Sequence, residues 1–148
     1  MDKSMFAETK KKIEKLMEEL REESQAAFAQ ESKAIFDRYP SLYSFGWKQY
    51  TKYWNDGDEC TFRVHSGEPD INGAECYDIY YGKGEFEKNQ DVPDGWPKMT
   101  KEEAKPIQKE VAAFLDVFES NIMHDMFEDH VKVTVTREGV QTESYEHE

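Results

Sequence analysis

The chain has 148 residues, of which 32 are acidic and 19 are Lys or Arg, so its formal net charge at pH 7 is −13. Basic patches supply most of the affinity of proteins for nucleic acids, so this acid excess argues against direct nucleic-acid binding. No apolar run approaches the roughly 20 residues of a membrane-spanning helix, and the N-terminus lacks the apolar stretch of a secretory signal, so we expect no membrane insertion.

The length is typical of one domain, and we expect a single α+β domain over residues 1–148. Its two cysteines, Cys60 and Cys76, fit neither a metal-binding spacing nor a redox Cys-x-x-Cys pair. We therefore expect reduced thiols and a cytoplasmic protein. The chain contains no phosphate-binding glycine loop, dinucleotide fingerprint, nucleophile elbow or H-E-x-x-H motif, so we predict no catalytic residue and no cofactor.

Residues 4–37 contain neither Gly nor Pro and are rich in good helix formers, which predicts one long helix within residues 1–38. At 1.5 Å per residue this helix would be about 50 Å long, which exceeds the diameter of a globule of this size. It should therefore project from the domain or pair with another copy as a homo-oligomer. Its apolar residues recur at helical spacing: Phe6, Ile13, Leu16, Met17, Leu20, Ala27, Phe28, Ala34 and Ile35.

The middle of the chain has the alternation and turn residues of a sheet. Residues 45–54 alternate between two faces, and Asp-Gly at 56–57 predicts a hairpin turn into a return strand at 60–64. A second turn signal at 69–73 precedes another alternating stretch at 75–81. The pattern predicts a three-stranded antiparallel meander.

A second helix is predicted after a loop at residues 88–99. Thr100 and Glu103 form a capping box, which marks the start of a helix. Pro106 lies too deep for the first turn, so we expect a kink or a separate short turn there. The apolar stripe of this helix has a regular helical period: Ile107, Val111, Phe114, Leu115, Phe118, Ile122 and Met126.

The C-terminal region alternates valine with polar residues over 130–136, which predicts a half-buried strand. Residues 139–148 would add a last strand or form an acidic tail. The element order predicts an α+β fold with a long N-terminal helix, a three-stranded antiparallel meander, a second helix packed across the sheet and a C-terminal strand or hairpin.

Aromatic residues are concentrated in the predicted sheet, since 14 of the 20 lie between Phe36 and Trp96. One helix can bury only one sheet face, so several should remain half exposed as a protein interface or ligand pocket, unless the long helix or a second subunit covers them. Interleaved basic residues suit a nucleotide-like ligand, although pairing with nearby acids explains them more simply. The candidate binding residues are Trp47, Lys48, Tyr50, Lys52, Tyr53, Trp54, Arg63, Tyr77, Tyr80, Tyr81 and Trp96.

His124 and Glu128 are the best metal-ligand candidates because they lie four residues apart near a helix end, with His130 just beyond. A site needs further converging ligands, however. A histidine near a helix C-terminus is also already favoured by the helix dipole. We therefore predict no metal site.

The segment FGWKQYTKYWNDGDECTF at residues 45–62 resembles a segment of small uncharacterised proteins from bacteria and their phages. In those proteins the pattern is similar to Q-Y-T-P-Y-F-N-D-G-D, so Lys52 and Trp54 depart from it. The resemblance implies a phage or bacterial origin and no particular activity. By analogy, small acidic phage proteins often inhibit host machinery.

Three functional hypotheses follow from these features. The first is a non-catalytic binding protein that acts as an inhibitor or adaptor of a host defence or nucleic-acid-processing protein, through the aromatic sheet face and an acidic surface. Acid is most in excess over residues 100–148, with 12 acidic and 5 basic side chains. The second is a binder or sponge of a nucleotide-like small molecule, and the third is an enzyme of unrecognised type.

Overall fold

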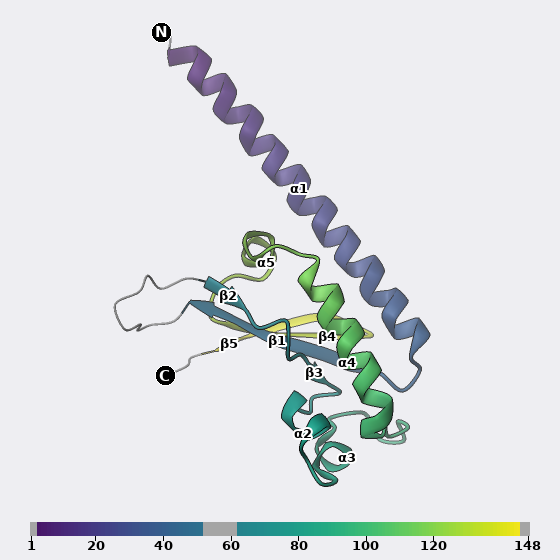
Figure 1. Ribbon diagram of the computed structural model, residues 1–148. Helices are drawn as coiled ribbons and strands as arrows, with labels where there is room; N and C mark the ends of the chain where they lie inside the picture. The colour runs from purple at the N-terminus through teal and green to yellow at the C-terminus, as the bar shows by residue number, and fades with distance from the viewer. Residues whose placement is uncertain (1–2, 52–61, 146–148) are drawn as a thin grey trace, which may run out of the picture.

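The computed structural model of the protein describes residues 3–51 and 62–145 (Figure 1). It confirms the α+β class, with a long N-terminal helix, an antiparallel sheet, further helices and a C-terminal hairpin. The helices are α1 (Lys3–Arg38), α2 (Cys76–Tyr80), α3 (Glu85–Asn89), α4 (Lys101–Asp116) and α5 (Ser120–Phe127). The strands are β1 (Ser44–Thr51), β2 (Phe62–Val64), β3 (Asp70–Ile71), β4 (Val131–Thr136) and β5 (Gly139–Ser144).

Strand β1 is the centre of the sheet. It pairs antiparallel with β2 and β3 on one side and with β4 on the other, and β4 pairs with β5. Phe45, Trp47 and Gln49 are buried, whereas Lys48 and Tyr50 are only half-buried. Because successive strand residues face opposite sides, this confirms the predicted alternation along β1.

One face of the sheet is covered by the C-terminal half of α1 together with α4 and α5. The ring of Phe28 in α1 lies 5.1–5.9 Å, between centroids, from the four rings of Trp47, Phe114, Phe118 and Phe127. These partners come from β1, from α4, from the segment after it and from α5. Phe28 is therefore the point at which the long helix is fixed to the domain.

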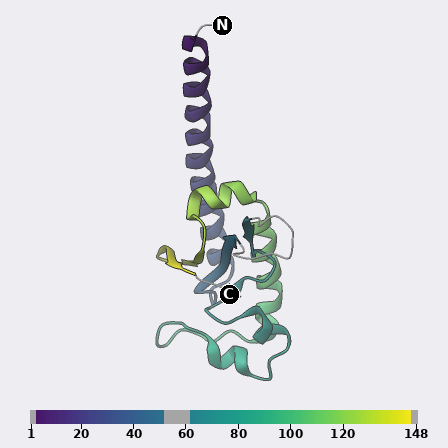
Figure 2. The ribbon, with the colours of Figure 1, turned by 90° about the vertical axis from the view of Figure 1, so that its left-hand side faces the viewer.

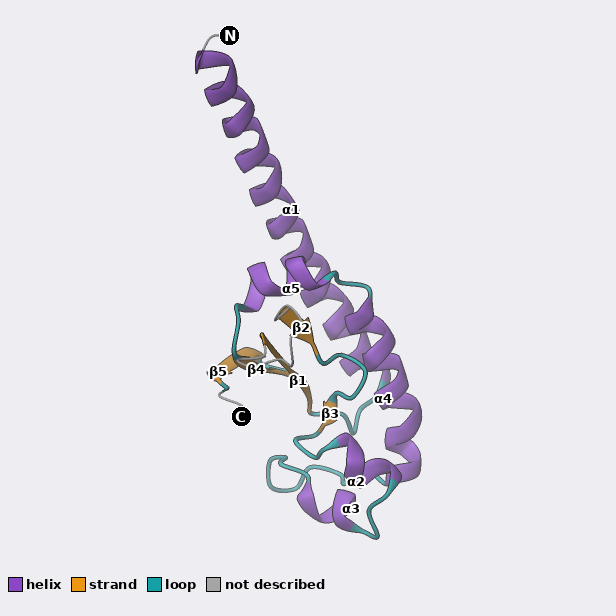
Figure 3. Ribbon diagram, turned by 60° about the vertical axis from the view of Figure 1, so that its left-hand side comes forward, coloured by secondary structure: helices purple, strands orange, loops and turns teal. Residues whose placement is uncertain are grey.

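The N-terminal half of α1 projects beyond the rest of the fold (Figures 2 and 3). Its large apolar side chains, from Met5 to Leu20, are more than half exposed. The long helix predicted from the composition is confirmed over almost the same range. It comprises a docked half, in which burial begins near Phe28, and an undocked half.

The third strand predicted over residues 75–81 is wrong, because this segment forms the short helix α2. Ile79 is fully buried, while Tyr77 and Tyr81, one helical turn apart, are exposed. Over seven residues the aromatic pattern fits both the two-residue period of a strand and the 3.6-residue period of a helix. The packing of Ile79 into the core favours the helix. The strand beside β1 is instead β3, in the register Phe45 to Ile71.

The turn predicted over residues 69–73 is confirmed. It closes only an isolated bridge between Ile71 and Ala74, not a hairpin into a third strand. Asn72 and Gly73 both have positive φ, at 52° and 81°, as a two-residue type I′ turn requires. Asn72 is fully buried. Its side-chain oxygen accepts from the backbone N–H of Tyr43 at 2.7 Å, and its amide donates to the carbonyl of Ser41 at 3.1 Å, so the turn is tied to the start of β1.

The second predicted helix is divided into α4 and α5 by a break at residues 117–119. Its start is confirmed, since the Thr100 hydroxyl accepts from the backbone N–H of Glu103 at 3.2 Å. Helix α4 runs from Lys101 through Pro106, so of the two alternatives, a kink or a separate short turn, the separate turn is wrong. The break lets α5 lie over the end of β1, where the Gln49 amide donates to the carbonyls of Met123 and Glu128.

Residues 139–144 form strand β5, so the C-terminal region continues as a hairpin rather than as a tail. Arg137 in the hairpin turn donates to the carbonyls of Phe36 and Tyr39 at 2.7 and 3.0 Å. Carbonyls at a helix C-terminus lack partners within the helix, and a cation there also favours the dipole. The hairpin turn therefore secures the docked end of α1.

Replacement of Phe28 by Ala should lower the free energy of unfolding by about 3–5 kcal/mol, because it removes a ring that is 3% exposed and leaves a cavity among four others. Urea denaturation followed by tryptophan fluorescence measures this change. Val117→Ala is the matched control, because its side chain is 74% exposed and should change stability by less than about 0.5 kcal/mol. Equal effects of the two substitutions would contradict the anchoring role of Phe28.

Candidate functional site

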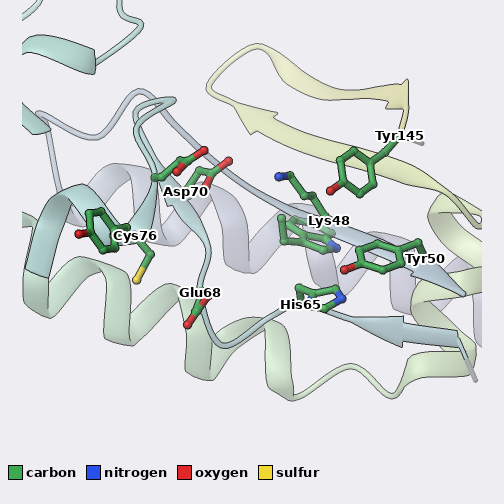
Figure 4. Close-up of a pocket in the computed structure, with 10 residues that line it drawn as sticks. Lys48, Tyr50, His65, Glu68, Asp70, Cys76 and Tyr145 are labelled. Carbon is green, nitrogen blue, oxygen red and sulfur yellow. The ribbon is translucent and has the colours of Figure 1, made fainter. Parts of the chain in front are cut away.

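The face of the sheet opposite α1, α4 and α5 carries a pocket of about 280 Å³, here called the sheet pocket (Figure 4). Its walls come from β1, from the segment that runs from the end of β2 through β3 to α2, and from the residue after β5. The lining residues are Trp47, Lys48, Tyr50, His65, Glu68, Asp70, Glu75, Cys76, Tyr77 and Tyr145.

One end of the sheet pocket is aromatic. The rings of Tyr50 and His65 stack with centroids 4.6 Å apart, and the ring of Tyr145 lies 5.4 Å from that of Tyr50. The Lys48 ammonium lies 4.8 Å from the centroid of the Tyr145 ring. Strand pairing explains this cluster. The His65 N–H donates to the Lys48 carbonyl at 2.9 Å, and the Tyr145 N–H donates to the His130 carbonyl at 2.7 Å, which continues the pairing of β5 with β4.

The other end of the sheet pocket is acidic, with the carboxylates of Glu68, Asp70 and Glu75. Burial raises the pKa of Asp70 to about 6, and Glu75 adds to the rise, although Lys132 and Lys48 oppose it. The Lys132 ammonium lies 3.8 Å from the Asp70 carboxylate. The two lysines thus offset only part of the cost of burying this charge, and a further cation beside Asp70 would be stabilised.

The thiol of Cys76 also lines the sheet pocket, on the same surface as His65. Burial raises the pKa of this thiol, and the charges of Glu68 and Asp70 raise it further. Nucleophilic cysteines have the opposite property, a lowered pKa that maintains the thiolate at neutral pH. Cys76 therefore lacks the lowered pKa of an activated nucleophile.

The structure brings four of the predicted binding residues, Trp47, Lys48, Tyr50 and Tyr77, together in the sheet pocket. Trp47 also lines the pocket, although its side chain is only 2% exposed. Its indole packs on Phe127 in the core, and its N–H donates to Gln49 at 2.9 Å. The reason is strand alternation, which directs Trp47 to the helix-covered face.

Two further predicted tyrosines, Tyr80 and Tyr81, lie beside the sheet pocket rather than in it. Tyr80 and Tyr81 line a neighbouring hollow between α2 and α4, together with Tyr77. The Tyr80 hydroxyl donates to Gln108 at 3.0 Å, which fixes α2 against α4. Tyr81 is 73% exposed and pairs with the ring of Tyr77 at 5.2 Å.

Two more of the predicted binding residues, Arg63 and Trp96, lie outside the sheet pocket. Arg63 is exposed on β2 and does not line the sheet pocket. Trp96 holds its loop to the domain, since its indole N–H donates to the Ser41 carbonyl at 2.9 Å and its ring contacts Tyr43. The predictions for Lys52, Tyr53, Trp54 and the turn at Asp56-Gly57 fall outside the described residues.

The weak metal candidates do not converge. The His124 ring packs edge-on against Phe62 at 4.8 Å, and the neighbouring Asp129 carboxylate accepts from the N–H and hydroxyl of Thr51 at 2.8 and 2.7 Å. Over residues 3–51 and 62–145, no three His, Cys, Asp or Glu side chains, with Glu128 and His130 included in the search, form a group that could hold a metal ion.

The sequence reasoning did not identify most of the sheet pocket. It missed His65, Glu68, Asp70, Glu75, Cys76 and Tyr145. Its only usable signal was the alternation that places Lys48 and Tyr50 on one face. The prediction of a strand over residues 75–81 gave no indication that Cys76 lies beside Lys48 and Tyr50, and the position of Tyr145 depends on the pairing of β4 with β5.

Comparisons with known proteins leave the site to be interpreted from its own geometry. No protein-family model, curated protein or solved structure matches this chain. Within the part of the chain that the structure describes, no helix combines the length and apolarity that are needed to cross a membrane.

Substitution of Asp70 by Asn should raise the free energy of unfolding at pH 8 by about 1–3 kcal/mol, because the folded-state pKa of about 6 exceeds the ordinary value of 3.8. The direction of this pH dependence follows from proton binding by Asp70. Between pH 4 and 6 the folded state holds the proton more tightly, so the wild type loses stability as the pH rises through that window. The advantage of the variant should therefore shrink toward pH 4, as urea denaturation at both pH values would measure.

Asp94→Asn, at an exposed loop position, is the matched control. It should alter the free energy of unfolding by less than about 0.5 kcal/mol at either pH. An Asp70→Asn variant that is less stable than the wild type at pH 8 would show that the ion pair with Lys132 outweighs the burial cost.

Proposed function

We propose that this chain is a non-catalytic binding protein that docks its sheet pocket onto a basic segment of a partner protein. The observation that carries the proposal is the meeting of aromatic rings and three carboxylates in one concave site. An Arg or Lys side chain has groups suited to both ends of this site. Its cationic head would pair with Glu68, Asp70 or Glu75, and its stem or guanidinium plane would lie against Tyr50 and Tyr145.

The charge balance of the pocket favours a cation over a phosphate. Among the described residues that line it, Lys48 is the single Lys or Arg, against three carboxylates. The net charge of −13 adds long-range attraction for a basic surface. A nucleotide-like ligand, the alternative predicted from the sequence, would have to place its phosphates beside Lys48 and accept repulsion from the acidic end.

Proteins that bind or process nucleic acids are the partners with the most basic surfaces, so they are the class that we infer for this chain. Occupation of such a surface would compete with nucleic acid and make the protein an inhibitor or adaptor. Host defence proteins of this kind fit the phage or bacterial origin implied by the segment at residues 45–62. The acid excess over residues 100–148 would widen the contact beyond the pocket.

The double substitution Glu68→Gln and Glu75→Gln should weaken binding of a short arginine-rich peptide at least about tenfold at pH 7.5, because it removes two of the three pocket carboxylates. Isothermal titration calorimetry on the full chain measures the dissociation constant. The affinity of the wild type should also fall at pH 5, where Asp70, with its pKa of about 6, is largely protonated.

The matched control is the double variant Glu31→Gln and Asp37→Asn, which removes two exposed acids from the docked half of α1, outside both the sheet pocket and residues 100–148. It should bind the peptide as the wild type does. Equal binding by the pocket variant and the control would reject the sheet pocket as the docking site. Tight binding of ATP with no binding of the peptide would favour the nucleotide alternative.

A further inference from the structure

The projecting half of α1 carries an apolar stripe of five side chains, here called the α1 stripe. Each is between 51% and 64% exposed, and within the described part of the chain no other element lies beside them (Figures 1 and 2). The members are Phe6, Ile13, Leu16, Met17 and Leu20. Their spacing in threes, fours and sevens is that of helices that pair side by side.

Charges along the same half of α1 are divided into two blocks on either side of Leu16 and Met17. Residues 10–15 contain four lysines and one glutamate, and residues 18–23 contain four glutamates and one arginine. Two such helices in parallel register would place each block beside its own kind. In the antiparallel orientation each basic block lies beside an acidic block, twice per pair.

The apolar residues of α1 also suit an antiparallel pair, which has a two-fold axis perpendicular to the helices. An axis between residues 16 and 17 sets Leu16 beside Met17 of the second copy and Ile13 beside Leu20. It also sets Phe6 beside Ala27, which is exposed on the docked half of α1. Charge and apolar contact therefore select one and the same arrangement.

We propose that α1 pairs with α1 of a second copy of this chain as an antiparallel two-helix contact centred between Leu16 and Met17. The overlap from Phe6 to Ala27 is about 33 Å long at 1.5 Å per residue. The two domains stand at opposite ends of this contact, so the dimer carries two separate sheet pockets and could bind a repeated target bivalently. The pairing itself does not depend on the function proposed for the pocket.

Disulfide trapping distinguishes the two orientations in the full chain. In a background with Cys60→Ser and Cys76→Ser, one chain carries Phe6→Cys and another carries Ala27→Cys. The antiparallel contact predicts a mixed disulfide between the two chains. Neither chain alone should cross-link, because like positions lie far apart. Cross-linking of the Phe6→Cys chain with itself would establish the parallel arrangement and overturn the proposal.

Sedimentation equilibrium tests the α1 stripe directly. The double variant Ile13→Glu and Leu20→Glu should raise the dimer dissociation constant at least about tenfold, because it places charge where two apolar layers meet. Circular dichroism should show a domain that is still folded. The control is Val117→Glu, which puts one glutamate at a 74% exposed site outside α1 and should leave the dimer intact. A wild-type chain that is monomeric at about 100 µM would reject the proposal.

Discussion

The structure depends on the contact of Phe28 with four other aromatic rings. This contact joins the long helix α1 to the central strand β1, to helices α4 and α5 and to the segment between them. Polar bonds extend the same junction, because the Trp47 indole donates to Gln49, whose amide donates to the carbonyls of Met123 and Glu128. The core is thus a single set of contacts on one face of β1.

Covering one face of the sheet leaves the other face for a different use. The helices bury Trp47, and strand alternation then turns Lys48 and Tyr50 toward the opposite side. There the acidic end of the sheet pocket retains a poorly compensated charge at Asp70. Binding sites often contain a charged group that destabilises the free protein and is accessible from a concave surface, because a ligand of opposite charge can offset that destabilisation.

The long helix α1 is also divided, along its length, into a part that packs on the domain and a part that is exposed. Its docked half is held by Phe28 and by Arg137 at the helix C-terminus, and its projecting half presents apolar and charged residues in an ordered pattern. The domain has no structural need of that pattern. A stable fold, an open pocket and an exposed helix face are therefore arranged on separate surfaces, and each can be altered without directly disturbing the others.

The sequence by itself determined the elements whose signals are local: the helix over residues 4–37, the alternation along β1, the cap at Thr100 and the valine strand β4. These features depend on propensity and periodicity over a few neighbouring residues. Only the tertiary structure decided that residues 75–81 are helical, because burial of Ile79 overrides an ambiguous pattern. It alone also assembled the sheet pocket, since Tyr50, Asp70, Cys76 and Tyr145 are brought together by strand register between distant segments, which no local pattern encodes.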